Sequence, residues 1–215
     1  MSPSTAAPEK LPTIAGLRRL TKSLAMLDAI ISPEWAYRYY SYNSQWGPGE
    51  EMASMRDGCG DEWFLLFDGY GAALKGFAHE SFLAADGSFA NQIQGSVPRG
   101  FASFMSEPAF SPNRATFCLW RRLDDPTWSV VAMKERRVSP QEDGSEKLLH
   151  LLDGVPASYQ HWAENYYEHP IPFHAVQALY KHQPLSADLI HELNPKSTPT
   201  NVAADAVEIG YPLPQ

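Results

Sequence analysis

The strongest constraint on the fold is a run of five consecutive apolar residues at positions 63–67 (WFLLF), followed by a glycine-containing turn at 68–71. A strand with one face in water alternates apolar and polar residues, whereas an uninterrupted apolar run is typical of a strand covered on both faces. Residues 72–78 are again mainly apolar, so the two segments predict an antiparallel hairpin that spans 63–78. The rest of the chain must then cover both sides of this hairpin.

Hydrophobic patterns elsewhere predict helices before and after a group of strands. Apolar residues recur at steps of three and four from Ile14 to Ile31, which is the helical period, and Thr13 can cap the start of that helix. Further strands are predicted from aromatic and apolar segments at 35–42, 51–56, 115–122 and 127–133. Further helices are predicted at 101–106, 145–152, 156–168, 173–180 and 186–194. The predicted fold class is α+β, an antiparallel sheet with an N-terminal helix and a C-terminal group of helices packed against it.

The predicted domain organisation is a flexible arm at 1–12, one α+β domain at 13–195 and a C-terminal tail at 196–215. Within the domain, the sheet is expected mainly at 35–133 and the helices at 13–32 and 145–194. A chain of 215 residues can bury a sufficient core without disulfides, and two cysteines do not make a disulfide framework. The sequence shows no signal peptide and no apolar run near the ~20 residues that span a membrane, so we expect a cytoplasmic protein.

The formal charge of −8 is concentrated in the last third of the chain. Residues 1–140 contain 14 basic and 15 acidic side chains, whereas residues 141–215 contain 3 basic and 10 acidic ones. Nucleic-acid binding requires a basic surface, so this distribution argues against DNA or RNA as the ligand. It favours a protein partner with a basic surface, although an acidic surface also simply keeps a protein soluble.

Polar residues suited to acid–base chemistry flank both ends of the predicted hairpin. Asp57, Asp61 and Glu62 precede its first strand, and His79 and Glu80 follow its second strand. The two ends of a hairpin lie side by side, so we expect these side chains near one another. Neighbouring strand residues point to opposite faces, however, and the chain has no Gly-x-Ser-x-Gly elbow to supply a nucleophile. His79 and Glu80 are therefore catalytic candidates, but no catalytic residue is assigned.

The predicted binding residues combine an aromatic side chain, an arginine and the acidic group before the hairpin. Interface hot spots are rich in Trp, Tyr and Arg, and the aromatic segment that begins near position 35 extends to Trp46. Arg56 directly precedes the acidic loop. The binding residues predicted on this basis are Trp46, Arg56, Asp57, Asp61 and Glu62.

Neither a metal site nor a cofactor site is predicted. His161, Glu164 and Glu168 share one face of the helix expected at 156–168, but this face is opposite the aromatic one and should be in solvent. Cys59 lies in a turn with two nearby carboxylates, which disfavour a thiolate nucleophile. The sequence also lacks phosphate-binding glycine loops, His-Glu-x-x-His and Cys-x-x-Cys.

Three stretches of the sequence resemble a group of bacterial proteins without an established activity. They are the aromatic segment at 37–46, the segment 52–81 that starts with MASMRDGCGDEW and ends with GFAHES, and the segment 159–195. In size, acidity and α+β character, that group resembles the immunity proteins of bacterial toxin systems, and the likeness covers most of residues 14–195. The resemblance implies protein binding and carries no catalytic motif, so no site residue is transferred from it.

These observations predict a non-catalytic protein-binding domain of the immunity type, which neutralises a basic toxin. The alternative is a small hydrolase or metal-dependent enzyme that uses His79 and Glu80 with Asp57, Asp61 or Glu62. The two hypotheses differ in what the hairpin ends should look like. An enzyme needs these side chains in one concave pocket, with pKa values shifted from their ordinary range.

Overall fold

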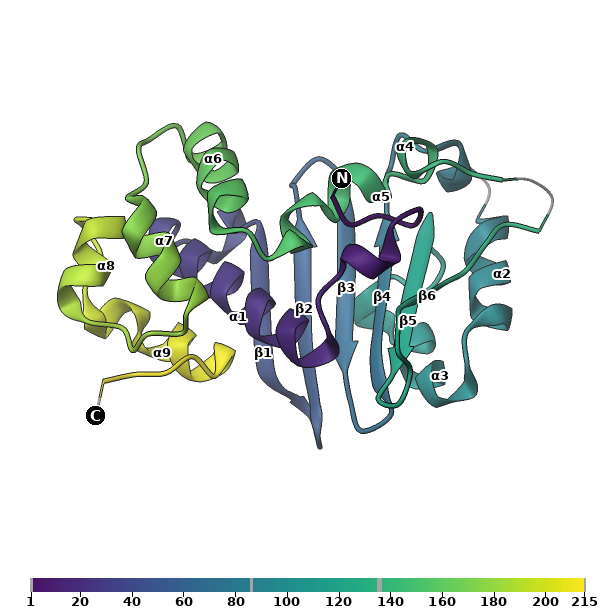
Figure 1. Cartoon of the computed structure of the whole chain (residues 1–215), viewed down its shortest axis with the longest axis horizontal. Helices are drawn as coiled ribbons and strands as arrows, with labels where there is room; N and C mark the ends of the chain where they lie inside the picture. The colour runs from purple at the N-terminus through teal and green to yellow at the C-terminus, as the bar shows by residue number, and fades with distance from the viewer. Residues whose placement is uncertain (1, 86, 135–136, 215) are drawn as a thin grey trace.

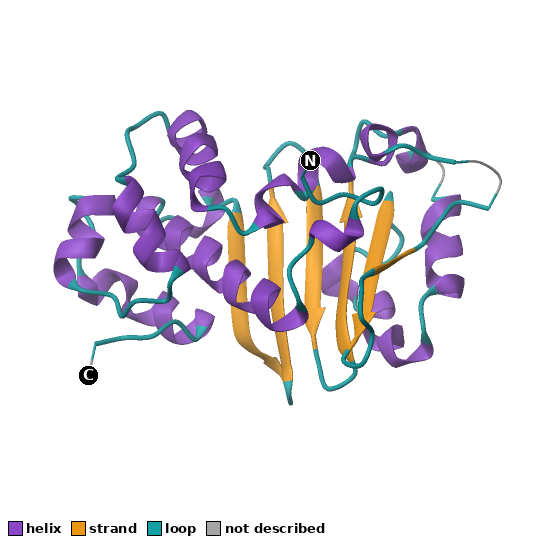
Figure 2. Ribbon diagram, viewed as in Figure 1, coloured by secondary structure: helices purple, strands orange, loops and turns teal. Residues whose placement is uncertain are grey.

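The computed structural model describes residues 2–85, 87–134 and 137–214. Within these residues, six strands form one antiparallel sheet whose spatial order follows the order along the chain. The strands are β1 (Tyr40–Gly47), β2 (Glu50–Arg56), β3 (Glu62–Phe67), β4 (Gly71–Phe77), β5 (Phe117–Arg122) and β6 (Ser129–Val130). Figure 2 shows helices on both sides of this sheet, and the predicted α+β class is confirmed.

Along the described part of the chain, one helix precedes the sheet, two lie between β4 and β5, and the others follow β6. The helices are α1 (Ile14–Ile31), α2 (Ser88–Ser96), α3 (Ala102–Ser106), α4 (Pro140–Asp143), α5 (Ser145–Leu148), α6 (Pro156–Tyr167), α7 (Phe173–Tyr180), α8 (Ala187–Leu193) and α9 (Pro199–Ile209). Helix α1 packs on β1 and also against α7, α8 and α9 of the C-terminal helices (Figure 1). Its start is capped as predicted, because the Thr13 hydroxyl accepts a hydrogen bond from the N–H of Gly16. None of the helices in the described ranges is both long and apolar enough to cross a bilayer.

Two hydrophobic cores lie on opposite faces of the sheet. The first core joins α1 and the C-terminal helices to Trp63, Leu65 and Phe67 of β3. The second core joins Phe64 and Leu66 of the same strand to apolar residues of α2 and α3. Successive strand residues point to opposite faces, so the uninterrupted run of β3 contributes to both cores. This confirms that the strand is covered on both sides.

Strands β3 and β4 form the predicted hairpin. Trp63 pairs with Gly76 across it, and a Cβ atom at Gly76 would lie 2.0 Å from the ring of Phe117 on β5. Glycine is therefore required there for the close approach of an aromatic ring. The Trp63 indole also donates a hydrogen bond to the backbone oxygen of Leu148 over 3.1 Å, which links the hairpin to α5.

The N-terminal segment at 1–12, predicted to be a flexible arm, packs on the domain instead. Ala7 and Leu11 are buried, and the backbone N–H of Thr5 donates to Ser145 Oγ over 3.0 Å. The Thr5 hydroxyl donates to the Asp143 carboxylate. The partners lie about 140 residues further along the chain, so no local pattern could have indicated this docking. Residue 1 is outside the described residues.

The C-terminal segment at 196–215, predicted to be a tail, contains helix α9. The helix starts with a reciprocal cap, in which the Thr198 side chain bonds the backbone of Asn201 and the Asn201 side chain bonds the backbone of Thr198. It packs against α1 and β1, and the Ser44 hydroxyl of β1 donates to the backbone oxygen of Glu208 over 2.7 Å. The segment is thus largely helical and packed on the domain, and residue 215 is outside the described residues.

The strand predicted at 35–42 begins later than expected. The first three residues form a 3₁₀ turn, η2 (Trp35–Tyr37), which precedes β1. The cause is tertiary, because the carboxylate of Asp28 near the end of α1 accepts hydrogen bonds from the N–H groups of Tyr39 and Tyr40 over 3.0 and 2.7 Å. These bonds bend the chain back toward α1 before the strand can start.

Other boundaries also differ from the predictions. The strand expected at 127–133 is reduced to β6, and the helix expected at 145–152 is divided between α5 and a 3₁₀ turn at His150–Asp153. Helix α2 (SFANQIQGS) was not predicted; it is short and mostly polar, and its buried residues are Phe89, Ala90 and Ile93. The segments 51–56, 101–106, 173–180 and 186–194 agree closely with β2, α3, α7 and α8.

Candidate functional site

Several predicted site residues gather at the end of the sheet where β3 begins and β4 ends. The backbone N–H of His79 donates to Asp61 Oδ1 over 2.9 Å, so the two ends of the hairpin are in direct contact. Glu80 follows on the surface and lines a shallow pocket together with Asp61, Ser81 and Lys147. The side-by-side arrangement is the one that antiparallel geometry predicts.

Asp61 is the centre of this cluster, and only 4% of it is exposed. Its Oδ1 lies 2.7 Å from His79 Nδ1, and its Oδ2 lies 2.8 Å from Nζ of Lys147 on α5. Burial opposes ionisation of this carboxyl, but the Lys147 ammonium and the two N–H groups of His79 outweigh it and lower the pKa of Asp61 below its ordinary value. The carboxylate is therefore kept ionised by partners within the cluster.

The contact with Asp61 determines what the imidazole of His79 can do. A carboxylate only accepts hydrogen bonds, so the ring nitrogen that faces it, His79 Nδ1, carries a proton, and Nε2 is the nitrogen left for other contacts. A general base also needs a nucleophile within reach, but the nearby Ser81 hydroxyl donates to the backbone oxygen of Glu142. Among the residues that the structure describes, no group of three or more His, Cys, Asp or Glu is arranged to hold a metal ion. The cluster thus contains an oriented base without a positioned nucleophile in that part of the chain.

Asp57 stabilises the loop before β3. Its Oδ1 accepts hydrogen bonds from the N–H groups of Cys59, Gly60 and Asp61 over 2.8, 3.0 and 2.9 Å. Gly58 and Gly60 have φ values of +75° and +120°, which side chains other than glycine rarely adopt. Asp57 therefore has a structural role: one of its carboxylate oxygens accepts three backbone N–H groups and fixes the loop.

Glu62 belongs to a different set of contacts from Asp61. Its Oε1 lies 3.7 Å from Nη1 of Arg114, whose guanidinium lies 4.1 Å from the ring centroid of Phe77. Adjacent strand residues point to opposite faces, so Glu62 is directed to the face covered by α2 and α3. The structure therefore brings Asp61, His79 and Glu80 together but separates them from Glu62.

The other two predicted binding residues, Trp46 and Arg56, lie on that same face. Trp46 is half-buried and stacks on Phe110 with ring centroids 5.2 Å apart, so it extends the second core. Arg56 lies near two rings, and its guanidinium carbon is 5.4 Å from the centroid of Phe64 and 6.0 Å from that of Trp35. Arg56 thus borders exposed aromatic residues that are not among the predicted binding residues.

This region exposes Trp35 by 59%, Tyr37 by 65% and, on α6, Tyr166 by 42%. These three residues are called the aromatic surface below. Tyr166 is supported by packed rings, since its ring centroid lies 4.9 Å from that of Trp162 and 5.3 Å from that of Tyr39. The available sequence signal was the aromatic segment at 35–42, but composition alone does not tell which of its rings are exposed.

A buried carboxylate connects the two elements that carry the aromatic surface. Asp28 of α1 is fully buried; its Oδ2 accepts from the backbone of Tyr39 and Tyr40, and its Oδ1 accepts from the hydroxyl of Tyr159 on α6 over 2.7 Å. Burial is the largest influence on this carboxyl and raises its pKa to about 6, against hydrogen bonds that lower it. Asp28 therefore positions η2 and α6 relative to α1. Its tyrosine partners lie between 11 and 131 residues away, so sequence reasoning had no local signal for it.

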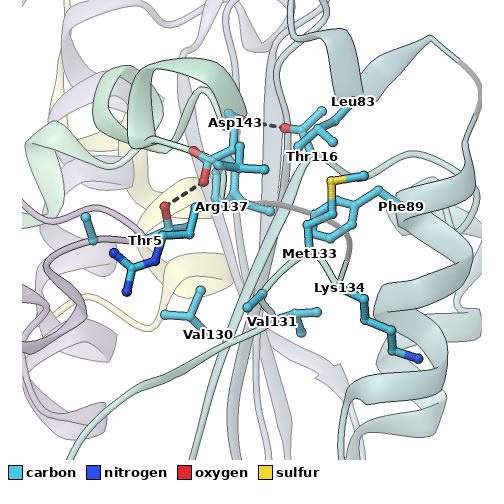
Figure 3. Close-up of a pocket in the computed structure, with 14 residues that line it drawn as sticks. Thr5, Leu83, Phe89, Thr116, Val130, Val131, Met133, Lys134, Arg137 and Asp143 are labelled. Atoms are coloured by element: carbon cyan, nitrogen blue, oxygen red, sulfur yellow. Dashed lines mark hydrogen bonds between the residues drawn. The ribbon is translucent and has the colours of Figure 1, made fainter.

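A cavity of about 420 Å³ lies between the N-terminal segment and the strands β5 and β6 (Figure 3). Phe89 and Met133 contribute to its apolar wall, and Thr5, Thr116 and Asp143 contribute polar groups. These polar groups bond one another, because Thr5 donates to the Asp143 carboxylate and Thr116 donates to the Asp143 backbone oxygen over 2.7 Å. Burial raises the pKa of Asp143. The N-terminal segment thus docks on the domain beside this cavity.

Comparison with known proteins finds no matching family model, no matching curated protein and no matching solved structure. The likeness to immunity-type proteins therefore stays a prediction. The functional argument depends on the contacts and the exposure of this chain's own residues.

Proposed function

We propose that this chain is a non-catalytic protein-binding domain of the immunity type, which neutralises a basic toxin by covering part of its surface. The observation that carries the proposal is the aromatic surface, where Trp35, Tyr37 and Tyr166 leave large apolar areas in water. Trp and Tyr are enriched among the residues that dominate binding energy, and here three of them are exposed near the same end of the sheet. The packed rings of Tyr39 and Trp162 hold Tyr166, so less conformational entropy of this side chain is lost on binding.

The charge distribution supports a basic partner. Helix α6, which carries Tyr166, belongs to the segment 141–215, where 10 acidic side chains outnumber 3 basic ones. Opposite net charge accelerates the encounter of two proteins, mainly through the association rate. Lysine and arginine side chains of the partner could then lie over the exposed rings through cation–π interactions. Long-range attraction and aromatic anchoring would thus act in sequence.

A small hydrolase is the second candidate, and the contact between Asp61 and His79 is the observation that favours it. The remaining candidates do not complete a hydrolase site, because Asp57 bonds its own loop and Glu62 is directed to Arg114. The variant His79→Ala separates the two proposals. If it abolishes toxin neutralisation in a folded protein while variants of the aromatic surface keep full neutralisation, the hydrolase replaces the binding domain.

The proposed function is tested by toxin neutralisation with matched variants. The partner to use is the product of a toxin gene adjacent to the gene for this chain, co-expressed in a bacterial host. The double variant Trp35→Ala and Tyr37→Ala should weaken the complex by about 30-fold, or about 2 kcal/mol, and abolish protection. The control Leu123→Ala removes an apolar side chain of equal exposure, 59%, from the opposite end of the sheet. Full protection by the double variant would overturn the proposal.

A further inference from the structure

A cleft beside the aromatic surface forms a separate candidate site. It lies between η2 and the β1–β2 pair and has a volume of about 140 Å³. We propose that this cleft binds a single oxyanion group of a ligand, a carboxylate or a phosphate, with Arg56 as the charged donor. The inference goes beyond the proposed function, because it rests on the residues that line the cleft and requires no toxin.

The size of the cleft restricts what can enter it. The cleft is small, with a volume of about 140 Å³. A carboxylate or phosphate group fits this volume, whereas a complete cofactor does not. The ligand must therefore present its charged group into the cleft while its remaining part lies outside, where Trp35 is exposed.

The cleft lies at the edge of the second core, beyond the part of the sheet that helices α2 and α3 cover. Figure 1 shows these helices toward the β6 side of the sheet, whereas the cleft lies at β1 and β2. Ser41 and Ser54 pair across β1 and β2 and both line the cleft. Ser54 also pairs with Phe64 of the second core, so the serine side chains lie on the same face, beyond the edge of the core.

Arg56 supplies a positive charge without an ionic partner. In the described part of the chain, its guanidinium has no hydrogen bond or ion pair. Arg38 lines the same cleft, but its charge is paired with Asp205 through bonds of 2.6 and 3.0 Å. Glu62 is the cross-strand neighbour of Arg56, and its carboxylate is directed to Arg114 instead.

The aromatic contacts of Arg56 leave its hydrogen-bond donors open. A guanidinium stacks on a ring through its flat face, while its five N–H groups point outward in its own plane. The rings of Phe64 and Trp35 can therefore hold the side chain without using these donors. The free edge can bind a carboxylate or a phosphate through two parallel N–H···O bonds, which is the arrangement that favours arginine over lysine.

Ser54 is the second, independent observation. The residue is only 4% exposed, and its hydroxyl has no hydrogen-bond partner among the residues that the structure describes. The Ser54 oxygen is not among the fully enclosed side-chain atoms that lack a partner, so the hydroxyl opens onto the cleft. This hydroxyl borders the cleft next to Arg56, so it can donate to the same oxyanion, and Ser41 adds another hydroxyl.

The inference is tested by NMR titration of the full chain with sodium acetate and with sodium phosphate at constant ionic strength. The Nε–H signal of Arg56 and the amide signals of Ser54 and Gly58 should shift in a saturable manner. Arg56→Met should weaken the response by about tenfold or more, because it removes the bidentate charged donor and keeps an unbranched side chain. Ser54→Ala should weaken it by a smaller factor, about two- to fivefold. Dispersed amide spectra of both variants would show that they are folded.

Arg99→Met is the matched control, since it removes one positive charge from an exposed position outside the cleft. It should bind both anions like the unmodified chain. Shifts that grow linearly with concentration, or equal weakening by Arg56→Met and Arg99→Met, would overturn the inference. Saturation by acetate alone identifies a carboxylate ligand, and saturation by phosphate alone identifies a phosphorylated one. Neither titration contains a toxin, so failure here is distinct from failure of the proposed function.

Discussion

The cluster around Asp61 and the aromatic surface lie at the same end of the sheet, but their side chains are used in different ways. Both carboxylate oxygens of Asp61 have partners from the chain, in His79 and Lys147. Trp35, by contrast, leaves most of its ring in water, and Arg56 has no ionic partner in the described residues. Side chains whose partners lie within the chain stabilise the fold. Exposed rings and unpaired donors contribute favourable free energy only when a ligand binds. The residues with the most obvious chemistry in the sequence are therefore those that the fold already uses.

The largest expected effect concerns the support of the aromatic surface. Asp28→Ala leaves the N–H groups of Tyr39 and Tyr40 and the Tyr159 hydroxyl without their acceptor, and it should lower the free energy of unfolding by about 3–5 kcal/mol. Urea denaturation followed by circular dichroism measures this change. Asp188→Ala on the exposed face of α8 is the control and should stay within about 0.5 kcal/mol. A loss below about 1 kcal/mol for Asp28→Ala would show that the surface is anchored by something else.

The buried carboxyl of Asp28 also makes the free energy of unfolding depend on pH. Its pKa rises from 3.8 to about 6 on folding, so the folded protein binds this proton more tightly than the unfolded chain. The resulting stabilisation is complete below pH 3.8 and is lost as the pH rises through 6, a change of about 3 kcal/mol at 1.36 kcal/mol per pH unit. Asp61 has the opposite sign, because its lowered pKa gives stability at neutral pH that is lost in acid. Unfolding free energies of the wild type and Asp28→Asn should be compared across this range. Parallel curves would contradict the prediction.

The next effect concerns the cluster itself. Asp61→Ala removes the acceptor of His79 and Lys147 and should lower the free energy of unfolding by about 1–3 kcal/mol. The loss is limited because the exposed Lys147 ammonium can be hydrated by water once it is released. Chemical denaturation measures the loss, and the toxin assay measures function on the same preparation. The variant should still neutralise the toxin at a temperature where it is folded. If neutralisation is lost in the folded variant, the cluster takes part in function and the contrast between the two regions fails.

The smallest expected effect is the change in the free energy of unfolding caused by substitutions in the aromatic surface. Trp35→Ala and Tyr37→Ala should each change the free energy of unfolding by no more than about 0.5 kcal/mol, because their rings are mostly in water already. Trp63→Ala, at a fully buried position of β3, should cost about 3–5 kcal/mol in the same assay. A loss above about 1.5 kcal/mol for either surface variant would place its ring in the core, and the proposed binding role would lose its basis.

Local pattern was sufficient wherever neighbouring residues determine the structure. The apolar run of β3 correctly predicts a strand covered on both faces, and the periodicity of α1 correctly predicts the helix that covers one of them. The start of β1 could not be predicted, because Asp28 bends residues 35–37 away from the strand through contacts that only the folded chain contains. The same holds for the N-terminal segment, which bonds Asp143 and Ser145.

The candidate site shows the same division. Antiparallel geometry predicts that Asp61 and His79 meet, and they do. The sequence did not indicate Lys147, which completes the cluster from 86 residues away. It also could not show that Trp46 packs on Phe110 while Trp35 is exposed, because both are aromatic residues of one segment and differ only in what the rest of the fold places over them.

Helix α9 has a consequence for self-assembly. β1 is a terminal strand of the sheet and is eight residues long, and a bare edge of this length can recruit strands from other molecules. The helix lies against this edge, and its Glu208 accepts the hydrogen bond from Ser44. The segment that reads as a tail in the sequence therefore shields the sheet from intermolecular pairing. A chain shortened before Pro199 should form β-rich aggregates at concentrations where the full chain stays dispersed.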